Sequence, residues 1–167
     1  MASLQDITDK IRAAVGADSG LGKSLKFDLK DDGVIHIDGG SRGNPGPSGF
    51  GVHVVDGKGQ VVAEHYGFIG KATNNVAEYQ ALVHAFKLAS ARGARRLEIR
   101  SDSELVVKQM NGVYKVKHPD MLTLWRQACT LRRGFEAAEI KHVRREQNKE
   151  ADALANRAMD LQESHLS

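Results

Sequence analysis

Short runs of alternating or continuous apolar residues recur along the chain and predict β-strands. They cover residues 34–37, 50–55, 60–69, 96–100 and 139–143. The second and third runs flank Asp56-Gly-Lys-Gly59, a sequence typical of a hairpin turn. The first three predicted strands therefore form an antiparallel meander, and two further strands follow later in the chain.

Apolar residues at three- and four-residue spacing predict helices after the meander. The first predicted helix ends at residue 92. The other three cover residues 104–110, 121–133 and 149–161. The first is the best defined, because Thr73 or Asn74 can cap its start and Gly93 follows its end. The order of three strands, helix, strand, two helices, strand and helix predicts an α/β domain.

The length of 167 residues suits one domain, which we expect over residues 34–162. Residues 1–33 are expected to form an N-terminal extension of unknown role, with a helix over 4–15 and a strand over 25–29. Residues 163–167 are expected to be a C-terminal tail. The extension contains no cluster of acidic or histidine residues that would suggest a site.

Charge and composition add modest constraints. The formal net charge is +3 and the sequence pI is about 9.0, which favours a polyanionic partner. The single cysteine, Cys129, cannot form an internal disulfide. No apolar run is long enough to span a bilayer, so we expect a cytoplasmic protein without a membrane partner, and a monomer.

Four acidic residues occupy positions that suit a shared site. Asp38 and Asp102 each follow a short apolar run, and Glu78 and Asp152 lie in the first turns of two helices. Each has a structural explanation when taken alone: a solvated loop residue, a helix cap, or an acid at a helix N-terminus. The stretch after Asp38 is rich in glycine, which lets a phosphate or sugar approach the backbone beside a metal.

The motifs around the four acids are specific in combination. They are Ile-Asp38-Gly-Gly-Ser-Arg-Gly-Asn-Pro-Gly-Pro, Thr73-Asn-Asn-Val-Ala-Glu78, Ser-Asp102-Ser-Glu-Leu-Val, and the segment from His142 through Asn148 to Asp152-Ala-Leu-Ala. In this order they resemble type 1 ribonuclease H, over residues 34–161. Residues 4–38 faintly resemble the start of bacterial sterol-carrier-like domains, but nothing after Asp38 continues that likeness.

The resemblance to type 1 ribonuclease H implies a ribonuclease H-like fold: a five-stranded mixed sheet, three antiparallel strands then two parallel ones, with helices on both faces. It implies an endoribonuclease that hydrolyses the RNA strand of RNA/DNA hybrids and leaves 5′-phosphate and 3′-hydroxyl ends. Two Mg²⁺ ions about 4 Å apart would generate the hydroxide and stabilise the leaving alkoxide. Mn²⁺ is a possible substitute, because both metals prefer oxygen ligands.

The same resemblance assigns catalytic roles. Asp38 would bridge both ions, Glu78 and Asp102 would hold the ion on the leaving-group side, and Asp152 would hold the ion that activates water. His142 matches the mobile histidine of the family, which is thought to assist proton movement or product release. An exposed histidine at a strand end is the alternative explanation for His142.

The resemblance also implies contacts with the substrate. RNA is distinguished from DNA by its 2′-hydroxyl groups, which backbone amides and short polar side chains read in the minor groove. The matching positions are Gly39, Gly40, Asn44, Thr73, Asn74, Asn75, Glu104 and Asn148. Thr73 would lie beside a phosphate of the DNA strand.

One departure from the family concerns residues 111–119, which are too few for the extra helix and basic loop of some bacterial members. Lys115, Lys117, Arg144 and Arg145 are therefore expected to bind the hybrid. Three alternatives remain open: a catalytically silent nucleic-acid-binding module, a relative with other chemistry such as a polynucleotidyl transferase or the ribonuclease H part of a reverse transcriptase, and a lipid-binding role for residues 1–38. The presence of all four acids favours the hydrolase.

Overall fold

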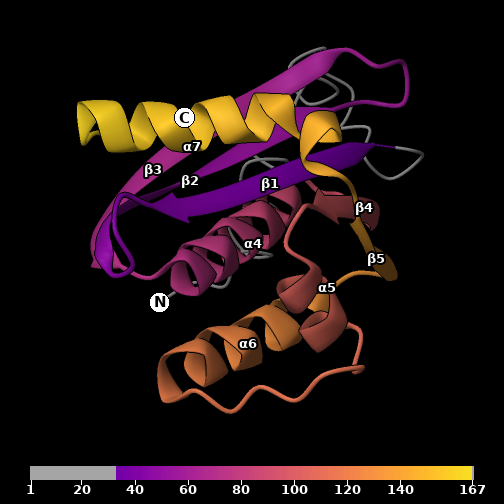
Figure 1. The fold of residues 1–167 in the computed structure, drawn as a ribbon. Coiled ribbons are helices and arrows are strands. Elements are labelled where there is room, and N and C mark those ends of the chain that lie inside the picture. Colours follow the sequence, from indigo (N-terminus) through magenta and orange to yellow (C-terminus); the bar gives the residue numbers. More distant parts are fainter. Residues whose placement is uncertain (1–32, 167) are drawn as a thin grey trace.

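Five strands form one mixed sheet in the order β3-β2-β1-β4-β5 within residues 33–166, the part of the chain that the computed structural model describes (Figure 1). They are β1 (Val34–Ser41), β2 (Gly46–Val55), β3 (Val61–Ala72), β4 (Arg96–Ser101) and β5 (Ala137–His142). β1 to β3 pair antiparallel, whereas β4 is parallel to β1 and β5 to β4. The predicted sheet of three antiparallel and two parallel strands is confirmed.

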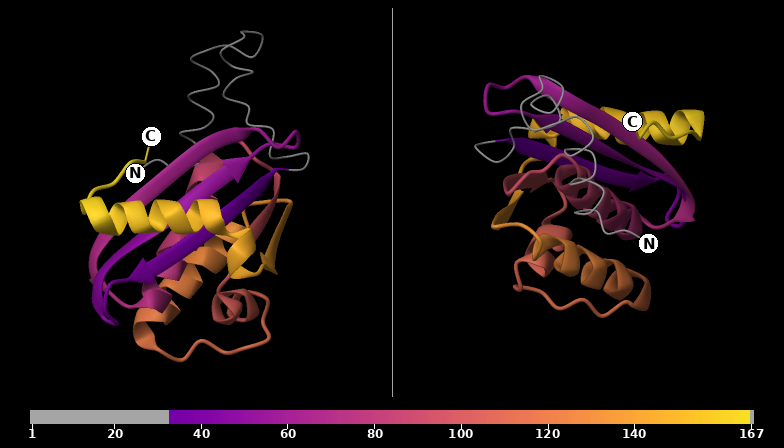
Figure 2. Two further views of the ribbon diagram at one scale, coloured as in Figure 1. Left: turned by 45° about the horizontal axis from the view of Figure 1, so that its top comes forward. Right: turned by 180° about the vertical axis from the view of Figure 1, so that it is seen from behind.

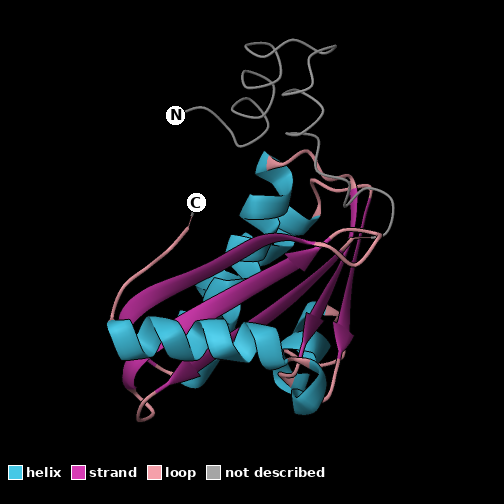
Figure 3. Cartoon of the chain, turned by 90° about the horizontal axis from the view of Figure 1, so that it is seen from above, coloured by secondary structure: helices cyan, strands magenta, loops and turns pink. Residues whose placement is uncertain are grey.

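Helices cover both faces of this sheet. They are α4 (Asn74–Ala91), α5 (Glu104–Met110), α6 (Pro119–Arg132) and α7 (Lys149–Leu161), with a 3₁₀ turn, η1 (Arg145–Gln147), before α7. α7 packs on β1, β2 and β3, while α4 packs on the opposite face and carries α6 (Figures 1 and 2). Seen from above, the sheet lies between α7 and the other helices (Figure 3). The helix and strand expected within residues 4–29 lie outside the described residues.

The core lies between the sheet and α4. Alternate residues of a strand face opposite sides, so Ile35 and Ile37 of β1 and Val52 of β2 point together toward α4. All three are fully buried, as are Leu82 and Phe86 of α4. Burying each such side chain stabilises the fold by about 1.5–3 kcal/mol, which fixes α4 against the central strands.

The glycine-rich stretch after Asp38 is more extended than the sequence predicted. β1 continues through Ser41 and β2 begins at Gly46, so the loop is only residues 42–45. We call this loop the glycine-rich turn, after the longer glycine-rich stretch that contains it. The pairs Gly40–Gly49 and Ser41–Ser48 continue the antiparallel ladder. Asp38 consequently lies within β1 rather than at its end, because cross-strand pairing outweighs the weak strand preference of glycine.

Side chains from two helices cover the outer edge of β5. Arg132 Nε donates to Ala138 O at 3.0 Å and its Nη1 to Met110 O at 2.8 Å. Asn111 Nδ2 donates to Ile140 O at 3.0 Å. Buried or edge carbonyl groups need such partners, and these bonds tie the end of α5 to β5.

The end of the chain returns to the sheet. Tyr66 of β3 and His165 form an antiparallel bridge, and the Phe68 N–H donates to Ser164 Oγ at 2.9 Å. The Tyr66 and His165 rings stack with centroids 5.8 Å apart. Two residues of the expected tail, Ser164 and His165, thus contact β3. Among residues 33–166, no helix has both the length and the apolar character needed to cross a membrane.

A histidine pair lies between β3 and α4. His65 Nδ1 and His84 Nε2 are 2.9 Å apart, so one of the two nitrogens donates a hydrogen bond and the other accepts it. The ring of Phe50 packs against His84 with centroids 5.2 Å apart. Burial, assisted by the charges of His65 and Lys87, lowers the pKa of His84 to about 4.

His84 should by itself lower stability in acid. As pH falls below 6.5, the unfolded chain takes up a proton at His84 that the folded chain refuses until about pH 4. The contribution of His84 to the unfolding free energy should fall by about 1–2 kcal/mol over that interval, a value reduced because His84 is only partly buried. Urea titrations of the wild type and His84→Gln across this range would test it, and equal losses in both proteins would contradict it.

Candidate active site

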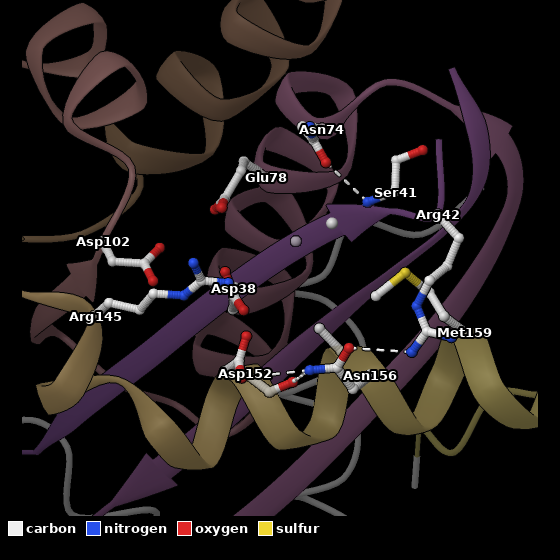
Figure 4. Close-up of a pocket in the computed structure, with 13 residues that line it drawn as sticks. Asp38, Ser41, Arg42, Asn74, Glu78, Asp102, Arg145, Asp152, Asn156 and Met159 are labelled. Carbon is white, nitrogen blue, oxygen red and sulfur yellow. Dashed lines mark hydrogen bonds between the residues drawn. The ribbon is translucent and has the colours of Figure 1, made fainter. Parts of the chain in front are cut away.

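Three carboxylates meet at the centre of the sheet. Asp38 of β1, Glu78 of α4 and Asp102 after β4 each offer an oxygen atom, and these atoms all lie within 4.8 Å of one another. They line an open cavity of about 440 Å³ (Figure 4). Asp152 of α7 lines the same cavity from the other side, outside the group of three. The structure thus brings all four predicted acids to one cavity.

Glycine brings Glu78 to Asp38. A Cβ atom at Gly39 would lie 2.3 Å from the carbonyl carbon of Ala77 and 2.4 Å from the backbone nitrogen of Glu78. No larger residue fits there without moving α4, so β1 and α4 are in backbone contact. The Gly39 N–H also donates to the Glu78 carboxylate. Gly39 therefore assembles the acidic cluster, besides lining the cavity.

Glycine also brings α7 close to β2. A Cβ atom at Gly51 would lie 2.3 Å from Ala151 O, and one at Gly49 would lie 2.9 Å from Ala158 Cβ. Three of the four buried residues of α7 are alanines, Ala151, Ala155 and Ala158, which suits this close approach. Asn148, directly before α7, donates from Nδ2 to Ile37 O at 2.8 Å and is fully buried. These contacts place the first turn of α7, with Asp152, over Asp38.

The electrostatics of the cluster are unfavourable. Burial, followed by the charges of Asp102 and Asp152, raises the pKa of Asp38 to about 8. Burial and the neighbouring Asp38 and Asp102 raise the pKa of Glu78 well above its usual value. The pKa of Asp102 is also raised by burial, although the Arg145 guanidinium opposes that shift. Like charges held this closely disfavour ionisation unless a cation joins them.

The donor set fits a divalent metal ion. Glu78 Oε2 is buried without a hydrogen-bond partner, although a buried carboxylate oxygen normally has one. Oxygen-only ligands of this kind suit hard cations such as Mg²⁺ and Mn²⁺. Asp38, Glu78 and Asp102 could hold such an ion together, with Asp152 available on the other side of Asp38.

The glycine-rich turn is fastened to the start of α4. The Ser41 N–H donates to Asn74 Oδ1 at 2.9 Å, and the Asn74 N–H donates to Asn44 Oδ1 at 3.1 Å. Thr73 caps α4, with Oγ1 accepting from the Val76 N–H at 3.3 Å. The two asparagines therefore shape the rim of the cavity.

The predicted substrate contacts separate into groups. Gly39, Gly40 and Asn74 line the acidic cavity. Thr73 lines a second cavity of about 630 Å³, together with Lys71 and residues of α6. The residues lining the acidic cavity do not include Asn44, Asn75 or Glu104, and Glu104 is an exposed partner of Lys108.

The structure locates two predicted site residues away from the acidic cavity. Asn148 was expected at the substrate; it is fully buried and its side-chain amide binds the backbone of β1, and a contact with the substrate stays a prediction. His142 was expected in the catalytic group, but it is exposed at the end of β5 and is not among the residues that line the acidic cavity. A catalytic role for His142 remains a prediction.

Three charged or amide side chains line the cavity without having been assigned to the acidic site from the sequence. Arg145, expected only as one of four cations that bind the hybrid, points between Asp102 and Asp38 in Figure 4. Arg42 and Asn156 lie toward the other end of the cavity. Asn156 follows Asp152 by four residues on a predicted helix, and that spacing could have indicated it.

Comparisons with known proteins agree with this geometry. Residues 36–158 match the family model described as reverse transcriptase-like. A ribonuclease HI from Halobacterium salinarum is 46% identical over 130 residues, which cover 77% of this chain and 65% of the relative. The chain belongs to the ribonuclease HI family.

Solved structures of this ribonuclease HI family have the same fold. The N-terminal RNase H domain of a protein from Mycobacterium tuberculosis is 48% identical, with a TM-score of 0.75, covering 77% of this chain and 94% of that domain. LC11-RNase H1, solved in complex with an RNA/DNA hybrid, is 40% identical, with a TM-score of 0.75. The match covers 78% of this chain and 99% of the LC11-RNase H1 chain. The chain spans only 35% of the length of the curated bifunctional mycobacterial relative.

Neutralising one carboxylate should stabilise the metal-free protein. Asp38→Asn removes a charge that the folded state disfavours, so we expect the unfolding free energy at neutral pH to rise by about 1–3 kcal/mol. Because the pKa of Asp38 is raised to about 8, protonation of this carboxyl should add stability to the metal-free wild type as pH falls from 8 toward 4. The difference in unfolding free energy between Asp38→Asn and the wild type should therefore shrink over that range.

Urea titrations with EDTA would measure both effects. Glu136→Gln, at an exposed position after α6, is the matched control and should leave stability unchanged. Added Mg²⁺ should stabilise the wild type more than Asp38→Asn. A lower metal-free stability of Asp38→Asn would show that the carboxylates are not in electrostatic conflict.

Proposed function

We propose that this chain is a metal-dependent endoribonuclease that hydrolyses the RNA strand of RNA/DNA hybrids and leaves 5′-phosphate and 3′-hydroxyl ends. The observation that carries the proposal is the convergence of Asp38, Glu78 and Asp102 within 4.8 Å at an open cavity, with Asp152 opposite. A family member of 40% identity solved with an RNA/DNA hybrid supports the choice of substrate.

Two divalent ions, Mg²⁺ or Mn²⁺, would supply a hydroxide near neutral pH and stabilise the leaving alkoxide. Asp38 would be the shared ligand, because it lies between Asp152 and the pair formed by Glu78 and Asp102. Burial of Asp38 and Glu78 excludes bulk water from their carboxylates. A low local dielectric strengthens the interaction of these carboxylates with a cation.

Arg145 would contribute the positive charge nearest to the reaction. Its guanidinium lies in the cavity, acts on Asp102, and comes from η1 immediately before α7. A cation there can hold a non-bridging phosphate oxygen and stabilise the negative charge that develops during hydrolysis.

Polar groups along the cavity rim would distinguish RNA from DNA. Backbone groups of Gly39 and Gly40 and the side chain of Asn74 lie beside the acids, where short polar groups can read 2′-hydroxyls in the minor groove. The second cavity contains Lys71 and Thr73 at the start of α4, and a phosphate of the DNA strand would bind there.

The first test is cleavage of a labelled RNA/DNA hybrid with Mg²⁺, compared with duplex DNA, single-stranded RNA and double-stranded RNA. We expect only the hybrid to be cut, with 5′-phosphate ends, and Asp38→Asn to lose activity by about 1,000-fold or more, because the shared metal ligand is removed. Binding of the hybrid without cleavage in either Mg²⁺ or Mn²⁺ would instead support a silent binding module.

A second test compares Arg145 with His142. Arg145→Ala should lower kcat by about 10- to 100-fold, because the charge facing the phosphate is lost. Arg145→Lys should recover part of the activity. His142→Ala should lower kcat by about 10-fold or more if the predicted catalytic role of His142 is right. A kcat within about 3-fold of the wild type would contradict that role and would agree with the position of His142 outside the residues that line the cavity. A larger loss in His142→Ala than in Arg145→Ala would assign the role to the histidine.

A further inference from the structure

The side-chain amide of Asn156 connects two parts of the cavity (Figure 4). Its Nδ2 donates to the backbone oxygen of Asp152 at 3.0 Å and to Asp152 Oδ2 at 3.3 Å. Its Oδ1 accepts from Arg42 Nη2 at 3.1 Å. Asn156 therefore joins an acid on α7 to a cation in the glycine-rich turn.

The partners fix the orientation of this amide. The carboxylate of Asp152 can only accept and the guanidinium of Arg42 can only donate, so the amide nitrogen must face Asp152 and the amide oxygen must face Arg42. Aspartate at position 156 would lack the donor, and alanine would lack both groups. Residues four apart on a helix lie on the same face, so asparagine reaches Asp152 without distortion.

Stability does not explain this arrangement. Arg42 also pairs with Asp160 Oδ1 at 2.7 Å, but the two side chains of that pair are 47% and 60% exposed. Exposed ion pairs contribute only about 0–1 kcal/mol. The contacts of Arg42 with α7 therefore add little to the fold, while they direct the Asn156 amide toward Asp152.

Asp152 is the acid that needs such direction. Asp38, Glu78 and Asp102 form the close group, and Asp38 and Glu78 are buried. Asp152 is only partly buried and stands outside that group, so its carboxylate has more freedom to turn. A donor on Oδ2 limits this freedom and leaves the carboxylate facing Asp38.

We propose that Asn156 is a positioning residue that presets the Asp152 carboxylate for a metal ion and links it, through Arg42, to the glycine-rich turn. The inference rests on the proposed function for its role in catalysis, but its effect on metal affinity is independent of the substrate. Groups that orient metal ligands typically change metal affinity or activity by about 10- to 100-fold when removed.

The test is Mn²⁺ binding to the substrate-free protein, measured by calorimetry, together with the Mg²⁺ dependence of hybrid cleavage. Asn156→Ala should weaken Mn²⁺ binding and raise the Mg²⁺ concentration for half-maximal rate by about 10-fold. The KM for the hybrid should change by less than about 2-fold, because Asn156 acts on the metal-binding carboxylate of Asp152 rather than on the substrate. Circular dichroism would verify that the variant is folded.

Two further variants define the link. Arg42→Gln should reproduce part of the Mn²⁺ effect, and its combination with Asn156→Ala should add little, because both act on one amide. Asp160→Asn is the matched control: it removes the other partner of Arg42 and should leave Mn²⁺ binding unchanged.

The outcomes are distinguishable from failure of the proposed function. Wild-type Mn²⁺ affinity and Mg²⁺ dependence in Asn156→Ala would overturn the positioning role, even if the hybrid is cut normally. If the wild type cuts no hybrid, the proposed function fails, while the Mn²⁺ measurements still decide whether Asn156 presets Asp152.

Discussion

Electrostatic repulsion among buried carboxylates is the constraint that the rest of this structure must overcome. Asp38 and Glu78 are each only 7% exposed and lie in contact range of Asp102. Their raised pKa values show that the folded protein disfavours their charges in the absence of a cation. The fold holds them together because the elements that carry them have little freedom to separate.

Close backbone packing supplies that rigidity. Gly39 lets α4 approach β1, and Gly49 and Gly51 let α7 approach β2. On each face of the sheet, a helix carrying one acid is thus held against the strands that carry or adjoin Asp38. Packing interactions spread over many buried residues compensate a local electrostatic cost, as is common where function requires like charges to be close.

The four acids are not equivalent. Asp38, Glu78 and Asp102 are set mainly by the backbone positions of β1, α4 and the end of β4, whereas Asp152 is oriented by a side-chain amide. Two arginines flank the cluster, Arg145 beside Asp102 and Arg42 beyond Asn156. A polyanionic substrate could therefore meet positive charge at both ends of an otherwise acidic cavity.

Hydrophobic periodicity in the sequence predicted the order of strands and helices, and motif spacing pointed to the four acids, because both are local properties of the chain. The mixed sheet was implied by the resemblance to type 1 ribonuclease H. Other features became apparent only in the folded protein: β1 continues beyond Asp38, the buried side chain of Asn148 binds the backbone of β1, and Arg145 rather than His142 lines the cavity. These outcomes depend on contacts between segments distant in sequence, such as Gly51 with Ala151. Which side chain enters a cavity is set by how closely such segments pack, and periodicity carries no information about that distance.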